Sequence, residues 1–196
     1  MSGVEMAYRR DIEIRIVDEQ LPPEGVAVIV NEFEQDGVVF DRDGIKVIAF
    51  AVDHGPAITP AYGYRIEYRG RVAVVSGDTR YNENVIRFGT GADLLIHEVA
   101  IARPELMSEP FIQRIMAHHT TPREAGLVFS RTRPRLAAFT HLVFLASDTI
   151  APASVADLIA ETRHTYSGPL EVGEDLMSFC IDKAISTHRF VPPRET

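Results

Sequence analysis

Four apolar runs in this sequence end in an acid or a histidine. They are Val47–His54, Val72–Asp78, Leu94–Glu98 and Leu136–His141. Short apolar runs of this kind are typical of buried β-strands. Polar residues at the ends of such strands converge on one edge of a sheet, where α/β folds place their ligand sites. The sequence therefore predicts one functional site to which four strands contribute.

The residue types at these four ends are those that bind metals or transfer protons. Imidazole nitrogens and carboxylate oxygens are ligands for zinc, with manganese or iron as alternatives. Asp78 directly follows Ser76-Gly77, where glycine lets the backbone come close to a ligand, and it is the best candidate to bridge two cations. Two other interpretations stay open: Asp78 as the cap of an Asx turn, and His54 or His141 as hydrogen-bonded histidines without a ligand.

Sequence patterns predict strands followed by alternating helices and strands. Alternation predicts a strand at Ile12–Val17, an apolar run covers Val26–Val30, and the turns at 41–44 and 69–70 predict hairpins. Helices are predicted at Asn82–Phe88, at Glu105–Ala117 and after the capping boxes that begin at Thr121 and Ser154. We expect a single α/β (α+β) domain over residues 1–196, with helices on one face of its sheet and a linker-like tail at Val191–Thr196.

Five short motifs follow one another along the chain: Val52-Asp53-His54-Gly55-Pro56, Ser76-Gly77-Asp78-Thr79, Leu95-Ile96-His97-Glu98-Val99-Ala100, His119-Thr120-Thr121 and Phe139-Thr140-His141. Taken in order, they resemble the metallo-β-lactamase superfamily, and within it the ribonuclease Z and arylsulfatase-like branch. The resemblance runs from about Asp11 to about Thr165 and implies a fold in which two sheets pack between outer helices, an αβ/βα sandwich.

The resemblance implies a pair of zinc ions, with manganese or iron possible in their place. His54 would bind one ion, His141 the other, and Asp78 would bridge them. The implied reaction is the hydrolysis of a phosphate or sulfate ester, in an RNA or a small molecule, by a water that the metals activate.

The resemblance also implies roles for residues that do not bind the metals. His119 would protonate the departing oxygen, and Glu98 would orient His119. His118 is adjacent and could be confused with His119, although spacing within the motif favours His119. His97 and Thr79 would support the site through hydrogen bonds behind the ligands. The remaining histidines, at 164 and 188, lie outside every motif and are predicted to be surface residues.

One family motif is absent from this sequence. The family's His-x-His-x-Asp-His motif supplies most of the metal ligands, and no His-x-His occurs here. We therefore expect an incomplete fold in which the C-terminal half is best represented, with partial or absent metal occupancy and little activity. An uncovered sheet face would then favour a homo-oligomer. The alternative function is a non-catalytic oligomeric scaffold or pseudoenzyme with a vestigial metal site.

Composition narrows the class of protein further. The formal net charge of −8 argues against a broad nucleic-acid-binding surface. The pair Arg69-Gly70 leaves no room there for the substrate-clamping arm that transfer-RNA 3′ processing would need, which favours the arylsulfatase and phosphodiesterase relatives.

No apolar run is long enough to span a membrane, and a cytoplasmic protein is expected. The lone Cys180 excludes an internal disulfide, and we expect it to be buried near a strand end rather than reactive.

Overall fold

A computed structural model of the chain describes residues 2–27 and 30–191. The chain divides into two units, residues 1–33 and 34–196, which are described separately. Part of the apolar run Val26–Val30 and nearly all of the tail Val191–Thr196 lie outside the described residues. The prediction of a single domain over residues 1–196 stays a prediction.

The regular elements of the first unit are all helical among its described residues. It contains α1 (Ser2–Glu13), a π-helical turn (Ile14–Asp18) and a 3₁₀ turn (Pro23–Val26). The predicted strand at Ile12–Val17 is therefore wrong. The π-helical turn has no buried residue, so the alternation there does not mark a buried strand face, and Arg15 forms an (i, i+4) ion pair with Asp11 at 2.9 Å that suits a helix.

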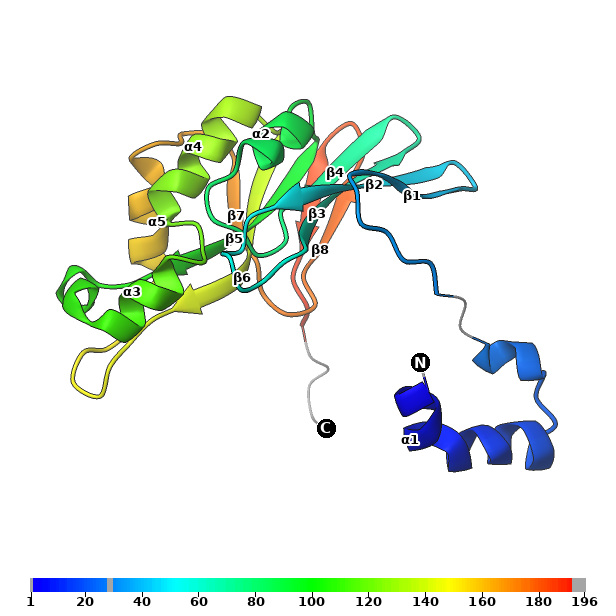
Figure 1. Ribbon diagram of the computed structural model, residues 1–196. Helices are drawn as coiled ribbons and strands as arrows, with labels where there is room; N and C mark the ends of the chain where they lie inside the picture. Colours follow the sequence, from blue (N-terminus) through cyan, green and yellow to red (C-terminus); the bar gives the residue numbers. More distant parts are fainter. Residues whose placement is uncertain (1, 28–29, 192–196) are drawn as a thin grey trace. The chain divides into compact units, whose positions relative to one another are not determined.

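The second unit contains a seven-stranded sheet in the order β1 to β7 (Figure 1). Strands β1 to β4 are antiparallel neighbours, and β4 to β7 are parallel neighbours. Both predicted hairpins are confirmed. The strands are β1 (Gly37–Arg42), β2 (Ile45–Val52), β3 (Ala61–Tyr68), β4 (Arg71–Val75), β5 (Leu94–Ile101), β6 (Leu136–Phe144) and β7 (Leu170–Val172).

Helices α2 (Glu83–Gly89), α4 (Pro122–Thr132) and α5 (Val155–Arg163) connect these strands. Both predicted capping boxes are present, at Thr121 and Ser154. The helix expected at Glu105–Ala117 is instead two elements, a 3₁₀ turn (Pro104–Ser108) and α3 (Pro110–Met116). Pro110 explains the break, because a residue before proline avoids the helical region, and Glu109 is extended with φ −78° and ψ 121°.

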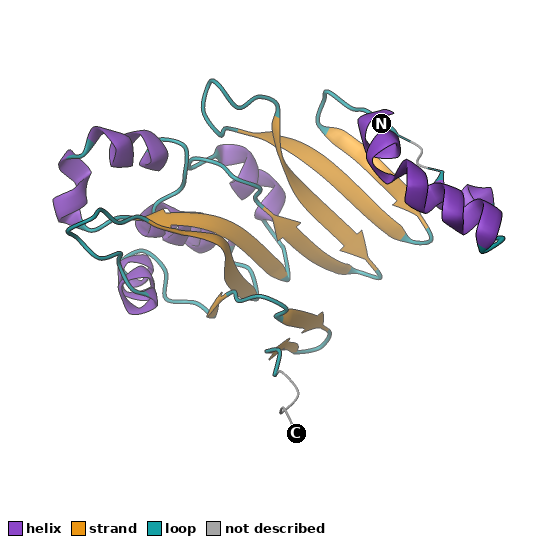
Figure 2. Cartoon of the chain, turned by 90° about the horizontal axis from the view of Figure 1, so that it is seen from below, coloured by secondary structure: helices purple, strands orange, loops and turns teal. Residues whose placement is uncertain are grey.

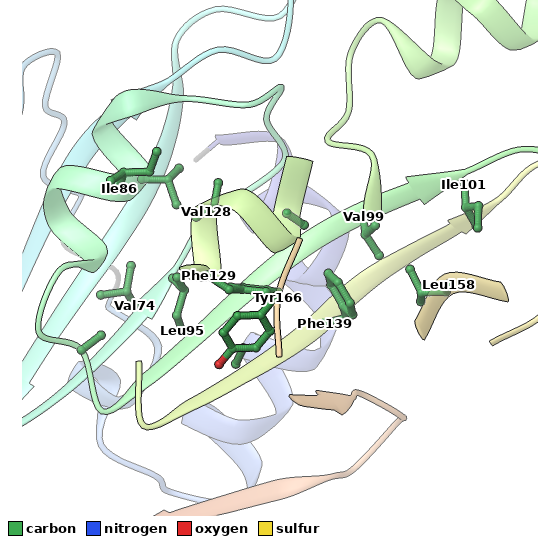
Figure 3. Packing of buried hydrophobic residues seen from close by; sticks show 14 of the residues in the cluster. Val74, Ile86, Leu95, Val99, Ile101, Val128, Phe129, Phe139, Leu158 and Tyr166 are labelled. Atoms are coloured by element: carbon green, nitrogen blue, oxygen red, sulfur yellow. The ribbon is translucent and has the colours of Figure 1, made fainter. Parts of the chain in front are cut away.

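The core lies between the sheet and helices α2, α4 and α5 (Figure 3). Phe129 of α4 lies at its centre, with its ring centroid 5.4 Å from those of Phe139 and Tyr166. Val74, Leu95 and Phe139 face the helices from three adjacent strands and are at most 1% exposed. Helices on one face of the sheet are thus confirmed, and their packing holds β4, β5 and β6 from one side.

A small hairpin, β8 (Ser178–Ile181) and β9 (Ile185–His188), packs on the other face of the sheet. Figure 2 shows it as the short strand pair next to the C-terminus. Its apolar contacts come from Phe179, Ile181 and Ile185. The prediction of a buried Cys180 is wrong: the thiol is exposed, because alternate residues of a strand face opposite sides.

The close approach of α4 and α5 gives a stability prediction. A Cβ at Gly126 would lie 2.1 Å from Thr165 Oγ1 and 2.8 Å from Thr162 O. We expect Gly126→Ala to lower the free energy of unfolding by about 1–3 kcal/mol, although alanine is the better helix former. Gly3→Ala is the matched control, because no atom lies within 4 Å of its Cβ position. Urea unfolding of both variants checks this, and equal stabilities would contradict it.

Candidate metal centre

The candidate centre lies at the sheet edge where four strands of the same direction present polar residues. Strand β2 runs in the same direction as β4, since each is antiparallel to β3, and β5 and β6 are parallel to β4. His54 follows the end of β2 and Asp78 follows the end of β4. The sheet thus brings together residues that are far apart in the sequence.

Strands β5 and β6 do not end at this point, as their apolar runs had suggested. Both continue, to Ile101 and Phe144, and the register shifts between Glu98 and Val99. Glu98 is paired with Thr140 and Val99 with Leu142, so His141 is the extra residue of a β-bulge, with φ +43°. A bulge re-aims a side chain next to a site, and here it turns His141 toward Asp78.

Asp78 lies between His54 and His141. Its Oδ2 is 4.0 Å from His54 Nε2 and 3.5 Å from His141 Nε2. In tetrahedral coordination at 2.0–2.2 Å, two ligand atoms of one zinc ion lie about 3.4 Å apart. The distance to His141 matches that spacing, whereas His54 and Asp78 would have to approach each other slightly to share an ion. The metal-ligand roles themselves stay predictions.

His54 is fixed by a reciprocal pair of hydrogen bonds with His118. His54 Nδ1 donates to the His118 carbonyl at 2.9 Å, and His118 Nδ1 donates to the His54 carbonyl at 2.8 Å. A carbonyl can only accept, so the proton of neutral His54 is on Nδ1 and Nε2 keeps its lone pair toward Asp78. This is the tautomer that a metal ligand requires.

The adjacent His119 forms a different pair, with the buried Glu98. His119 Nδ1 is 3.1 Å from Glu98 Oε2, and Glu98 Oε1 accepts the Thr120 N–H at 2.7 Å and the Thr79 N–H at 3.4 Å. Burial raises the pKa of Glu98 to about 8, and the charge of Asp78 adds to that effect. Burial also lowers the pKa of His119, so a proton shared between the two side chains is favoured over separated charges.

These contacts distinguish the two neighbouring histidines. His118 contacts the backbone around His54, whereas His119 contacts Glu98 and lies with its ring centroid 5.5 Å from that of His141. His119 therefore stays the predicted proton donor, because it contacts Glu98 and His118 does not. The positioning contact of His118 was not predicted, and its signal in the sequence is Gly55, whose φ of +89° and missing side chain make room for the His118 ring.

A second possible ligand group overlaps the first. Glu98, His119 and His141 each offer an atom within 4.8 Å of the other two. Glu98 fits such a role less well than Asp78, because both of its oxygens already have hydrogen-bond partners within the protein. We therefore regard Asp78, with 38% of its side chain exposed, as the better bridging residue.

Thr79 and His97, the residues predicted to support the site, both bond to the backbone near it. The Thr79 hydroxyl links the backbone of Asp53 and Arg80, so it joins the ends of β2 and β4. His97 is fully buried and bonds through Nδ1 to the Glu98 carbonyl at 2.7 Å, while its Nε2 has no partner among the described residues. Burial lowers the pKa of His97 to about 4, which leaves its ring neutral.

One ion pair beside the centre was also not predicted. Arg80 donates to the Asp53 carboxylate, which accepts the Gly55 N–H at 2.9 Å as well. The Gly55 bond, followed by the Arg80 bond, lowers the pKa of Asp53. Asp53 therefore stabilises the turn that presents His54 and is not itself directed to the metal centre. The other two histidines, His164 and His188, are exposed, as expected.

Fold and centre together define a mixed α/β protein with imidazoles and carboxylates gathered at one edge of its sheet. A family model for the β-lactamase superfamily domain matches residues 4–142. The chain belongs to the metallo-β-lactamase superfamily, as its motifs indicated.

Relatives with curated names point to one branch of the superfamily. The chain is 32% identical over 186 residues to ribonuclease Z from Mycolicibacterium paratuberculosis and covers 61% of it with 90% of its own length. It is also 32% identical over 176 residues to ribonuclease Z from Mycobacterium bovis, covering 59% of that protein with 87% of this chain. The chain therefore spans about three fifths of the length of these relatives.

Solved structures agree on the fold. The metallo-β-lactamase fold protein YhfI from Bacillus subtilis aligns with a TM-score of 0.56 and 19% identity, over 81% of this chain and 60% of that one. Zn(2+)-bound PqqB from Methylobacterium extorquens aligns with a TM-score of 0.53 and 14% identity, over 74% and 53%.

The contact between Gly55 and His118 leads to a second prediction. A Cβ at Gly55 would lie 2.5 Å from His118 Nδ1, so we expect Gly55→Ala to displace the His118 ring and loosen His54. Gly70→Ala is the matched control: its φ is +73°, but its Cβ position is open, and it carries only the left-handed strain of about 1–2 kcal/mol.

Long-range ¹⁵N–¹H NMR of the histidine rings reads the tautomer directly. We expect the His54 proton on Nδ1 in the wild type and in Gly70→Ala, and a mixture of tautomers in Gly55→Ala. Identical His54 spectra in the two variants would show that His118 does not position His54.

Proposed function

We propose that this centre belongs to a metal-dependent phosphoester hydrolase, and that His54, Asp78 and His141 bind its metals. The observation that carries the proposal is Asp78 flanked by two imidazole nitrogens at 4.0 and 3.5 Å. Relatives named ribonuclease Z support phosphate esters, RNA among them, ahead of the sulfate esters that the arylsulfatase-like resemblance allows. Zinc is the expected ion, with manganese or iron as alternatives.

A divalent cation bound here would supply positive charge for the ester oxygens and lower the pKa of water. The chain's own residues would do the rest. Asp78 and the Nε2 atoms of His54 and His141 would hold the cations, and His119, held by its bond to Glu98, would give a proton to the departing oxygen. Thr120 and Thr79 keep Glu98 in place through their N–H groups.

The ligand count limits what this chain does alone. A catalytic zinc takes about three protein ligands, whereas His54 with Asp78, and His141 with Asp78, give two for each ion. We propose that the chain alone binds metal weakly and has little activity. The alternative is a non-catalytic scaffold or pseudoenzyme with a vestigial site, and the same measurements separate the two.

Metal content and turnover of the Asp78→Ala variant test the proposal. We expect up to two zinc ions per wild-type chain at saturating zinc, and slow hydrolysis of bis-(p-nitrophenyl) phosphate. Asp78→Ala removes the atom that both ions share, so zinc binding should weaken at least tenfold at both sites and turnover should be lost. Glu98→Gln leaves the three proposed ligands in place and changes only the partner of His119, so it should keep zinc binding and slow turnover.

Two substitutions control for surface binding. Asp148→Ala removes an exposed acid, and His164→Ala removes an exposed histidine outside the centre; neither should change zinc content measured by isothermal titration and elemental analysis. Wild-type protein without zinc or turnover would favour the scaffold. Equal zinc binding by Asp78→Ala and Asp148→Ala would reject the centre.

The face of the sheet opposite α2 supports a proposal about assembly. Register places Phe40, Ile45, Val47, Ile66 and Tyr68 on that face, and Phe40, Ile45 and Tyr68 are 41%, 36% and 39% exposed. Apolar side chains that are exposed next to one another mark interaction surfaces when their patch is large. We propose that a second copy of the chain covers it, in the self-complementary pairing of a twofold dimer.

Sedimentation equilibrium tests this assembly. We expect a dimer for the wild type and a monomer for Tyr68→Glu, which places a charge in the patch. Leu127→Glu is the control, because Leu127 is 43% exposed on α4 and lies outside the patch. A monomeric wild type at high concentration would contradict the proposal.

None of the helices in the described part of the chain combines the length and the apolar composition that a bilayer crossing requires.

A further inference from the structure

A groove opens beside the metal centre, against α3. Its volume is about 250 Å³, and its lining includes the imidazoles of His54, His118 and His119 together with Ile58, Phe111 and Arg114. Pockets that enclose a whole drug-sized ligand measure roughly 300–1,000 Å³. The groove is therefore suited to one ring system of a larger molecule whose reacting group lies at Asp78.

The charge of the groove differs from that of the chain. The chain has a net charge of −8, and four other cavities each include a carboxylate, from Glu161, Glu67, Glu174 and Asp53 respectively. The described residues that line this groove include three histidines and an arginine but no acid. Such a lining suits an anionic ligand.

Two of the lining residues are exposed apolar side chains. Phe111 is 61% exposed and Ile58 is 45% exposed. Phe111 lies in the first turn of α3, and Arg114 follows three residues later, which places both on the same side of the helix. Arg114 is exposed and forms no hydrogen bond or ion pair with another described residue, so its guanidinium is available to a ligand.

We propose that this groove binds a nucleotide of a single-stranded nucleic acid next to the ester that reacts at Asp78. The base would stack on Phe111 and Ile58, and a neighbouring phosphate would bind Arg114. A simple aryl ester has one anionic group, which would occupy the metal centre and leave Arg114 without a partner. A strand has a ring and a phosphate in every unit. The inference rests on the proposed function for its reacting group but not for its binding.

Binding of a hexauridylate labelled with fluorescein, measured by fluorescence anisotropy with the full chain in EDTA, tests the groove without metal. We expect Phe111→Ala to weaken binding about tenfold through loss of stacking. Arg114→Gln should weaken it too, and should reduce the slope of log K against log salt by about 0.7, the value for one phosphate contact on a single strand.

Met107→Ala and Arg42→Gln are the matched controls. Met107 is 41% exposed close to α3 but does not line the groove, and Arg42 is an exposed arginine of β1. Both should bind the hexauridylate as the wild type does, and circular dichroism should show all four variants folded.

Two results would overturn the inference: no binding of the hexauridylate by the wild type, or equal binding by Phe111→Ala and Met107→Ala. Failure of the proposed function is distinguishable. Nucleotide binding without zinc-dependent turnover would keep the groove and reject the hydrolase, whereas zinc-dependent turnover together with hexauridylate binding that Phe111→Ala leaves unchanged would keep the hydrolase and reject the groove.

Discussion

The buried carboxylate of Glu98 is the interaction on which the centre depends. It is 0% exposed, and its oxygens accept bonds from the Thr120 and Thr79 N–H groups and pair with His119. One side chain of β5 thereby joins the segment after β4 to the segment before α4. A buried polar group costs free energy unless it is hydrogen-bonded, so separating these segments would leave the buried Glu98 carboxylate without partners and would be unfavourable. The position of His119 follows from that requirement.

The parts of the fold that were predicted correctly depend on local chemistry. The capping boxes at Thr121 and Ser154 specify where α4 and α5 begin, because both partners of each bond lie within four residues. Hairpins were equally predictable, since turn residues fix their register. Where tertiary context decides, the sequence was misleading. Ile12–Val17 alternates without a buried face, and Cys180 lies on the outer side of its hairpin.

The centre shows the same division. Polar residues at the ends of apolar runs were enough to identify His54, Asp78 and His141 as candidates for one site, because strands of the same direction place such residues at the same edge of the sheet. The bulge at His141 and the contact between His118 and Gly55 could not be predicted. Both depend on how two backbone segments far apart in the sequence meet. Gly55 is a local signal for the second contact, but it does not specify His118 as the partner.

The hydrogen bonds around the centre orient the predicted ligands, which bears on how an ion would bind. His54 is held in the tautomer with a free Nε2, and the Glu98 oxygens are satisfied by the protein. Ligands that are already oriented lose little conformational freedom on binding, so two ligands for each ion hold it better here than two on a mobile loop. Orientation of the ligands does not replace a third ligand, however. A third ligand would add a bond to the ion, whereas orientation only lowers the entropic cost of binding. On the proposed assignment, ligand orientation favours binding and the count of two ligands for each ion limits it, so the predicted centre would bind its ions weakly. The neighbouring groove has no acid among its described lining residues, and the nucleotide proposed for it would bind whether or not an ion is present.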